Sequence, residues 1–319
     1  MLISSLFCVD RIGVKILITG IVPLYKPRGM TSFDCVSKIR HIIGQKRVGH
    51  SGTLDPNVDG VLPICLGHAT KVVDYLMQSG KVYQGTITLG FSTTTEDLDG
   101  EIVNSNFDFM PIPDAKIDQT LNSFLGQSIQ IPPMFSAVKV NGKRLYEYAR
   151  AGEQVERPKR QIEVKQFVRL NSSSYDNTSR TQTFSFEVRC GKGTYIRTLA
   201  TDLGRKLGVP AVMSKLTRIQ SGGFNLADTV TFDDLDHAVN AHKLDKIIFP
   251  ISYALKGFKT IILTDEQWNR VKHGGFLSID EVACEDEMIV LKYSNIDRAL
   301  YYKNEQENNY KPKKMFDLD

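Results

Sequence analysis

Asp55 is a residue whose surroundings suit chemistry, because it follows a glycine-rich stretch and precedes a proline. The stretch reads Gly49-His50-Ser51-Gly52-Thr53-Leu54-Asp55-Pro56. Glycine allows positive φ and a close approach of another backbone, and Pro56 keeps Asp55 out of the helical region. A carboxylate held on such a stiff, bent loop can act as a nucleophile or stabilise a positive charge. Ordinary turns share this composition, so the loop alone leaves a purely structural role open.

Arg197 is a second candidate, because it stands in the first turn of an expected helix. It follows Gly191-Lys192-Gly193-Thr194-Tyr195-Ile196, and an apolar stripe continues from Ile196 to Leu207. A cation is unfavourable against the positive end of a helix dipole, so we expect Arg197 to have an anionic partner. The two glycines lack the remaining residues of a phosphate-binding loop, and we therefore expect no nucleotide cofactor.

The elements that must position these side chains are visible in the pattern of apolar residues. A short strand at residues 18–24 leads to Thr31, which is expected to cap a helix that ends at Gly44. Residues 81–89 alternate as a strand that carries Tyr83, a side chain that belongs either to the core or to a site. Residues 184–190 form a further strand with one buried face. The tail is expected to hold a helix near 266–272 and strands near 288–293 and 299–303.

Basic residues gather in two stretches. Residues 26–50 carry six Lys/Arg against one Asp, and residues 139–169 carry nine Lys/Arg against four Glu. The second stretch also contains two tyrosines and Asn141-Gly142, a strong signal for a β-hairpin. Cations and aromatic rings together suit a nucleic acid, because cations meet phosphates and rings stack on bases. A solvated surface that keeps an inserted hairpin soluble explains the same pattern.

The composition narrows the setting. The chain has 319 residues, 41% of them hydrophobic and 24% charged, which is typical of a globular protein of about two domains. Its five cysteines are far apart and form no CxxC or Cys/His cluster, so we expect no metal and a reducing, cytoplasmic setting. Residues 1–20 lack the features of a signal peptide or membrane span, and we expect them to be an N-terminal extension.

With these residues assembled, the chain resembles the TruB family of tRNA pseudouridine synthases over roughly residues 21–319. The resemblance rests on several motifs in the right order. They are Lys26-Pro27-x-Gly29-x-Thr31-Ser32, Gly49-His50-x-Gly52-Thr53-Leu54-Asp55-Pro56, Gly60-Val61-Leu62-Pro63, Lys81-x-Tyr83, Gly191-x-Gly193-Thr194-Tyr195-Ile196-Arg197 and Leu216-x-Arg218-x-x-x-Gly222-x-Phe224. Ser51 stands where threonine is commoner, and Asn57-Val58-Asp59 replaces a more apolar run, but neither departure removes a reactive group.

The resemblance implies an α+β fold. The expected catalytic domain covers residues 21–254, with a curved, mostly antiparallel mixed sheet flanked by helices and an RNA-binding thumb at about 130–160. A small β-rich, PUA-like domain is expected at 255–319. The implied reaction turns the T-loop uridine at tRNA position 55 into pseudouridine, without a cofactor. The implied partner is the T-arm stem-loop, bound by a monomer that needs no membrane or nucleotide cofactor.

The family's functional residues carry over by their motifs. Asp55 corresponds to the catalytic aspartate, Arg197 to the arginine paired with it, and Tyr83 to the tyrosine that stacks on the target base. Four further residues are expected to bind substrate: His50, which pries the base from its loop, Lys26 in the pocket framework, Tyr195 beside Arg197, and the apolar wall residue Leu216.

Both roles open to Asp55, attack on C1′ or proton removal at C2′, require the carboxylate to be ionised. Burial raises the pKa of a carboxyl group, and a guanidinium within about 4–6 Å lowers it. We expect Arg197 to outweigh burial. Asp59 would oppose Arg197 if its carboxylate lay close, but the expected role of Asp59 is that of a turn residue. Two other functions remain: an RNA-binding or tRNA-folding protein without catalysis on the same scaffold, and a small-molecule phosphate enzyme.

Overall fold

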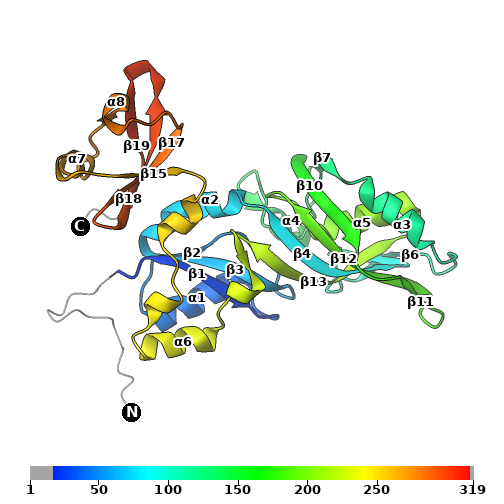
Figure 1. Cartoon of the computed structure of the whole chain (residues 1–319). Coiled ribbons are helices and arrows are strands. Elements are labelled where there is room, and N and C mark those ends of the chain that lie inside the picture. Colours follow the sequence, from blue (N-terminus) through cyan, green and yellow to red (C-terminus); the bar gives the residue numbers. More distant parts are fainter. Residues whose placement is uncertain (1–16, 317–319) are drawn as a thin grey trace, which may run out of the picture.

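The computed structural model describes residues 17–316. The N-terminal extension expected at residues 1–20 lies, up to residue 16, outside the described residues. Figure 1 shows a long larger part, which holds the main sheet, and a smaller β-rich part coloured orange to red. No helix among the described residues is long and apolar enough to cross a membrane.

The main sheet has ten strands and is mostly antiparallel, as expected. Its central order is β1-β3-β13-β4-β12-β10-β7, and β2, β14 and β11 pair with β3, β13 and β12. The single parallel pairing joins β13 to β3. The strands are β1 (Gly20–Lys26), β2 (Val48–His50), β3 (Asp59–Leu66), β4 (Lys81–Leu89), β7 (Gly126–Gln130), β10 (Arg160–Arg169), β11 (Ser174–Asp176), β12 (Thr181–Cys190), β13 (Ala211–Ser221) and β14 (Phe224–Asn225).

Close backbone contact explains a glycine at the parallel junction. Gly60 has φ +111°, and a Cβ atom there would lie 2.2 Å from the carbonyl oxygen of Arg218. Only glycine tolerates both conditions. The junction therefore brings the start of β3, just after the Asp55 loop, against the strand that carries Leu216 and Arg218.

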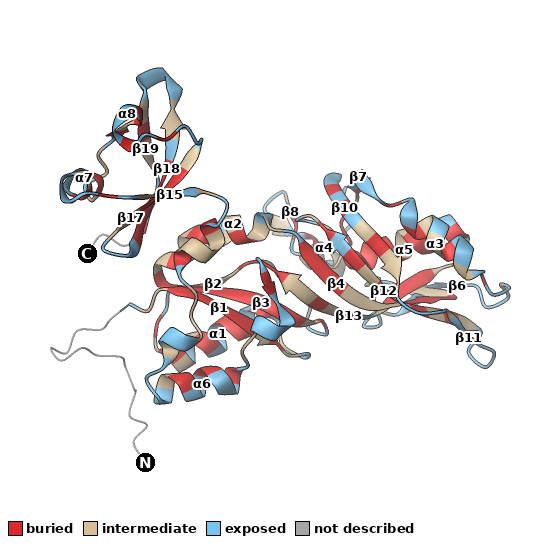
Figure 2. Cartoon of the chain, in the orientation of Figure 1, coloured by how far each residue is buried: buried red, intermediate tan, exposed pale blue. Residues whose placement is uncertain are grey.

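Helices cover the two ends of this sheet separately. The helices α1 (Ser32–Ile43) and α6 (Phe232–Asn240) pack with β1 and β3 around one apolar core, with residues such as Ile39, Leu62 and Leu235 fully buried. Thr31 caps α1 through a capping box with Asp34, and Gly44 ends it in the left-handed conformation, as predicted. The helices α3 (Asp114–Asn122) and α5 (Ile196–Leu207) pack on the other end. Figure 2 shows that buried residues are concentrated in the central strands.

Two short segments lie outside the main sheet. A two-stranded hairpin, β5 (Phe91–Thr93) and β6 (Ile102–Ser105), follows β4. Between β7 and β10 the chain forms β8 (Lys139–Val140), β9 (Lys143–Arg144) and α4 (Leu145–Ala151). Asn141 and Gly142 join β8 to β9 with φ of +51° and +83°, which confirms the predicted tight hairpin. These residues fall within the expected thumb.

Short helices make the remaining connections. The helices η1 (Gly67–Val72) and α2 (Val73–Gln78) connect β3 to β4, and η2 (Leu226–Asp228), η3 (Leu244–Lys246) and η4 (Ile251–Leu255) lie between β14 and the smaller part. A second sheet, with the order β15-β17-β18-β19-β16, contains β15 (Lys259–Ile262), β16 (Leu277–Ser278), β17 (Met288–Tyr293), β18 (Ile296–Asn304) and β19 (Asn309–Met315). It carries α7 (Asp265–Val271), α8 (Ile279–Val282) and η5 (Glu305–Glu307).

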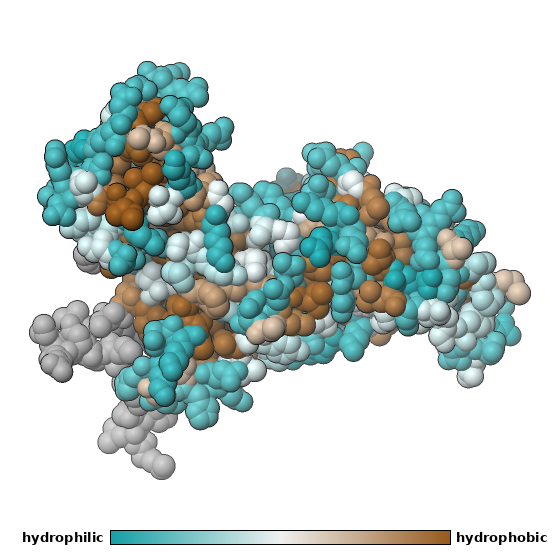
Figure 3. Space-filling model, in the orientation of Figure 1, coloured by the Kyte–Doolittle hydropathy of each residue, from teal (hydrophilic) through white to brown (hydrophobic). Residues whose placement is uncertain are grey.

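The smaller part has its own core and also shares one with the larger part. Trp268, Leu291 and Tyr310 belong to a cluster built only from residues after 262. A second cluster joins Val290 and Leu300 to η1 and α2. Figure 3 shows hydrophobic residues at the surface of both parts on the face drawn. The second sheet begins a few residues after the predicted boundary at 254/255, which stays a prediction.

Candidate active site

A buried lysine forms hydrogen bonds to the backbone of the loop that carries Asp55. Lys26 is completely buried at the end of β1, and its Nζ donates hydrogen bonds to the carbonyl oxygens of Pro27, Pro56 and Val58 at 3.0, 3.0 and 2.7 Å. Two of these acceptors, Pro56 and Val58, follow Asp55 within three residues. Lys26 therefore fixes the backbone on which the carboxylate stands, as its expected place in the pocket framework requires.

The start of α1 supports the same loop. Ser32 accepts a hydrogen bond from the Leu54 amide at 2.8 Å through Oγ, which also lies 3.2 Å from the Leu54 carbonyl oxygen. The Gly29 amide donates to the Pro56 carbonyl oxygen at 2.9 Å. The motif before α1 and the loop after β2 thus form one unit, although about 25 residues separate them in the sequence.

Arg197 has the anionic partner that its position predicted. Its Nε lies 3.0 Å from Oδ2 of Asp55 and 3.6 Å from Oδ2 of Asp97. The other guanidinium nitrogens donate to the carbonyl oxygens of Thr95 at 2.8 Å and Phe135 at 2.9 Å. Since Arg197 is only 5% exposed, these contacts leave its side chain little freedom.

The pKa of the Asp55 carboxyl group is shifted in the direction opposite to the expected one. Burial raises the pKa of the Asp55 carboxyl group, and the net direction stays upward although Arg197 and Lys26 lower it. The prediction that the guanidinium outweighs burial is therefore wrong. Part of the reason is the second carboxylate: Asp97 also raises the pKa of Asp55 and shares the same guanidinium.

Asp59 is not the carboxylate that opposes the effect of Arg197 on the pKa of Asp55. It begins β3 and accepts hydrogen bonds from Thr217 Oγ1 at 2.6 Å and from Tyr25 at 3.1 Å, and it forms an ion pair with Arg28 at 3.2 Å. Burial alone would raise the pKa of Asp59, but these hydrogen bonds and the Arg28 charge lower it overall. Its contacts tie the loop to β13 instead.

A cavity of about 280 Å³ joins most of the predicted site residues. Asp55, Tyr83, Tyr195, Arg197 and Leu216 all line it. Tyr83 comes from β4, Leu216 from β13, and Tyr195 caps the start of α5. Tyr83 and Leu216 are 6% and 5% exposed, so the carboxylate faces an aromatic ring and an apolar wall in a confined space. This arrangement suits a planar base held beside a reactive acid.

The comparisons with known proteins agree with this geometry. Residues 40–196 match the family described as TruB family pseudouridylate synthase (N terminal domain). Residues 197–256 match the tRNA pseudouridylate synthase B C-terminal domain. The tRNA pseudouridine synthase B of Lactiplantibacillus plantarum is 55% identical over 304 residues, covering 94% of this chain and 99% of that protein. The chain belongs to the TruB family.

Further relatives support the family and the fold. The tRNA pseudouridine synthase B of Pediococcus pentosaceus is 57% identical over 296 residues, covering 93% of this chain and 98% of that protein. A solved H/ACA RNP bound to a substrate RNA containing 2′-deoxyuridine has a TM-score of 0.69 and 26% identity, covering 93% of this chain and 85% of that one. The predicted resemblance and the α+β fold class are confirmed.

Two of the predicted site residues lie outside the cavity lining of this TruB-family chain. Lys26 lies behind the loop, as described above. His50 ends β2, is half-buried, and has a buried Nδ1 without a hydrogen-bond partner. Burial and the Arg218 guanidinium lower the pKa of His50, so its ring stays neutral at physiological pH. His50 is two residues from Gly52, which does line the cavity.

The sequence patterns missed three residues of the site. Asp97 stands in a turn about 100 residues before Arg197, and nothing near it predicts their contact. Lys81 and Arg218 line the cavity and lie inside quoted motifs, but neither was assigned a role. Arg218 could have been identified from the sequence as a charged residue at a position of its strand that otherwise points into the core.

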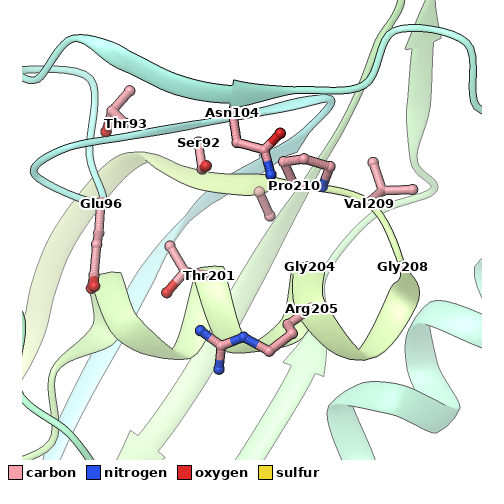
Figure 4. Close-up of a pocket in the computed structure, with 11 residues that line it drawn as sticks. Ser92, Thr93, Glu96, Asn104, Thr201, Gly204, Arg205, Gly208, Val209 and Pro210 are labelled. Atoms are coloured by element: carbon pink, nitrogen blue, oxygen red, sulfur yellow. The ribbon is translucent and has the colours of Figure 1, made fainter.

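A second hollow of about 460 Å³ lies between the β5–β6 hairpin and α5. Figure 4 shows Thr201 between Glu96 and Arg205, with Asn104 on the opposite side near Ser92. Glu96 accepts a hydrogen bond from Thr198 Oγ1 at 2.7 Å. This hollow has no counterpart of the Asp55–Arg197 pair, so the smaller cavity is the candidate active site. Within residues 17–316 no group of three His, Cys, Asp or Glu side chains is placed to hold a metal ion.

Proposed function

We propose that this chain converts the uridine at position 55 of the tRNA T loop into pseudouridine, with Asp55 as the reacting acid. Isomerisation of uridine to pseudouridine in tRNA is the family's reaction and the activity of this chain. The observation that carries the finer proposal is the Asp55–Arg197 pair, 3.0 Å apart, in one cavity with Tyr83 and Leu216.

The reaction breaks the C1′–N1 bond, turns the uracil, and joins C1′ to C5. A carboxylate at the sugar serves it in either of two ways, by attack on C1′ or by taking a proton from C2′. Arg197 aims the Asp55 carboxylate, because its Nη atoms are tied to the Thr95 and Phe135 carbonyl oxygens while Nε faces Asp55. The ion pair also favours the ionised form that both routes require.

The uridine reaches this acid only after it leaves its stack in the loop. Extrusion of a base costs a few kcal/mol, which stacking on Tyr83 offsets. Leu216 closes the wall of the cavity and helps to exclude water, which would hydrolyse an intermediate and cut the base from the RNA. We assign to His50 the space that the extruded base vacates, and to Tyr195 contact with the bound nucleotide.

The basic segment at 139–169 supports recognition of a folded T arm. The hairpin and α4 carry exposed Lys139 and Arg150, and the guanidinium of Arg150 lies 5.3 Å from the ring centre of Tyr146. Folded RNA is recognised mainly by its shape, its backbone and its splayed loop bases. We further propose that the chain acts as a monomer in the cytoplasm, where the free, buried Cys35, Cys65, Cys190 and Cys284 stay reduced.

Pseudouridine mapping on an unmodified tRNA transcript tests this function. The wild-type chain is expected to form pseudouridine at position 55 without a cofactor, and Asp55→Asn is expected to bind the RNA but form none. A transcript with cytidine at position 55 is the matched control. Tight binding without turnover by the wild-type chain would favour the tRNA-folding alternative, and modification at another site would contradict the T-loop assignment.

A further inference from the structure

Two buried cations in the active-site cavity have no part in the mechanism above. Lys81 and Arg218 line the cavity and are 7% and 0% exposed. Arg218 Nε donates to the Val61 carbonyl oxygen at 2.8 Å, and Nη2 donates to the Gly52 carbonyl oxygen at 3.2 Å. Its Nη1 is buried and has no hydrogen bond of good geometry, although the guanidinium also interacts with the Tyr83 hydroxyl, whose pKa burial raises and Arg218 lowers. Burying a charged donor without a partner is costly, so an unpaired guanidinium nitrogen in a cavity indicates a ligand.

The two side chains converge at one point above Gly52. A Cβ atom on Gly52 would lie 3.6 Å from Lys81 Cε and 3.8 Å from Arg218 Nη1. Gly52 also has φ +113°, so a residue with a side chain is strained there. The absence of a side chain at 52 leaves both charged groups facing the cavity.

No carboxylate compensates these charges. Among residues 17–316, neither Lys81 nor Arg218 forms an ion pair, and the Lys81 ammonium reaches only the Met77 carbonyl oxygen at 3.3 Å. Burial first, and the neighbouring Arg218 and Lys192 second, lower the pKa of Lys81 to about 8, with Cys190 acting in the opposite direction. An anion placed between the cations would relieve both the repulsion and the missing hydrogen bond.

We propose that Lys81 and Arg218 bind a backbone phosphate of the substrate RNA that adjoins the extruded uridine. This inference rests on the proposed function, since it places the uridine against Asp55 and Tyr83 in the same cavity. The uracil ring and the ribose are neutral, so the phosphodiester groups beside the uridine are the anions that enter with it. A guanidinium and an ammonium together provide the donors that phosphate oxygens accept best.

Such a contact would hold the nucleotide out of its loop. Stacking on Tyr83 fixes the base, whereas a phosphate bound over Gly52 fixes the backbone on the other side of the ribose. Two anchored points orient C1′ toward Asp55 more strictly than one, and correct orientation lowers the barrier to reaction. The pair would also retain the RNA when the C1′–N1 bond is open.

A double-mutant cycle on the phosphate and the lysine tests this assignment. T-arm RNAs carry a neutral methylphosphonate in place of the phosphate 5′ or 3′ of the target uridine, and a third carries it in the stem. With the wild-type chain, one of the two loop substitutions should weaken binding on the order of tenfold, and the stem substitution should have a much smaller effect. Lys81→Met should weaken binding to the normal RNA by a similar factor. The affinity of this variant should then be the same for the normal RNA and for the RNA with the sensitive loop methylphosphonate.

Two other variants separate a phosphate contact from a general loss of charge or fold. Lys215→Met removes an exposed lysine from β13, outside the cavity lining, and should leave the loop-phosphate effect intact. Arg218→Lys keeps the charge but removes the fork of donors, and should reduce the effect of the methylphosphonate; the circular dichroism spectrum of each variant checks its fold. If both cavity variants misfold, the wild-type measurement still refutes the site when neither loop methylphosphonate weakens binding.

The outcome for this site is distinct from the outcome for the proposed function. The phosphate site is refuted if neither loop methylphosphonate weakens binding more than the stem substitution does. It is also refuted if a loop methylphosphonate and Lys81→Met weaken binding independently, so that their effects multiply. Either result leaves pseudouridine formation, and thus the proposed function, intact. If the wild-type chain forms no pseudouridine in the normal RNA but the cycle shows coupling, the proposed reaction fails and the anion site stands.

Discussion

Asp55 and Asp97 share one nitrogen atom, Nε of Arg197, at 3.0 and 3.6 Å. One buried guanidinium therefore faces two carboxylates, and each affects the other through it. Asp97 comes from the turn after the first strand of the β5–β6 hairpin, so a segment outside the main sheet contributes to the charge balance at Asp55.

Removal of the second carboxylate tests that balance. Asp97→Asn should lower kcat at least tenfold, because Arg197 loses a contact that holds it in place and a mispositioned group readily costs that much. In this variant the loss of activity at low pH should begin at a lower pH than in the wild-type chain, since the Asp97 charge raises the pKa of Asp55. Single-turnover rates against pH measure both effects, and binding of T-arm RNA should be nearly unchanged. Asp108→Asn, at an exposed ion pair with Arg180, is the control.

The pH dependence of the wild-type chain follows from the same carboxylate. Burial raises the pKa of Asp55 above its ordinary value of 3.8, and the proposed reaction requires the ionised form. Activity should therefore be full well above the raised pKa and fall as the pH drops through it, at a pH higher than that at which a solvated aspartate titrates. Single-turnover rates between pH 4 and 8 with saturating RNA would show this limb; full activity down to the ordinary aspartate range would contradict it.

The local pattern of the sequence predicted much of the fold, where short-range physics decides. The strand at 81–89 and the hairpin turn at Asn141-Gly142 depend on neighbours along the chain, and both were predicted within a residue. The strand predicted near 288–293 coincides with β17. Of the site, the contact of Arg197 with an anion followed from the helix dipole alone.

Long-range contacts explain what the sequence did not reveal. The contact of Asp97 with Arg197 depends on how a hairpin and a helix about 100 residues apart pack together. The pKa of Asp55 depends on its burial in a cavity that segments far apart in the sequence enclose, so the sign of the shift was predicted wrongly. Arg218 was part of a recognised motif, but its orphaned nitrogen is visible only in the packed structure.

Lys26 offers a test of how the loop is held. Lys26→Met should destabilise the chain by about 3 kcal/mol, because buried carbonyl oxygens left without a donor cost roughly 1–3 kcal/mol each. The Pro56 oxygen keeps the Gly29 amide, but those of Pro27 and Val58 lose this donor. Urea denaturation measures the loss, and the rate of pseudouridine formation should fall as well because the Asp55 backbone is released. Lys243→Met, at an exposed position after α6, should change neither.

The assignment of residues 139–169 to RNA binding leads to a prediction about salt. Binding through phosphates releases counterions, so the affinity for the T arm should fall steeply as the salt concentration rises. Lys139→Gln with Arg150→Gln removes two exposed cations of the hairpin and α4, and should reduce the slope of log affinity against log salt by about 1.4 to 1.8. Fluorescence anisotropy with labelled T-arm RNA measures the slope.

The control for this prediction uses cations of similar exposure at the far end of the sheet. Lys116→Gln on α3 with Arg180→Gln beside β11 removes the same charge but should leave the slope unchanged. An equal decrease in both double variants would mean that net charge, and not a phosphate contact at the hairpin, sets the affinity. A slope that stays steep after loss of Lys139 and Arg150 would instead place the RNA backbone along residues 26–50, where the other cluster of basic residues lies.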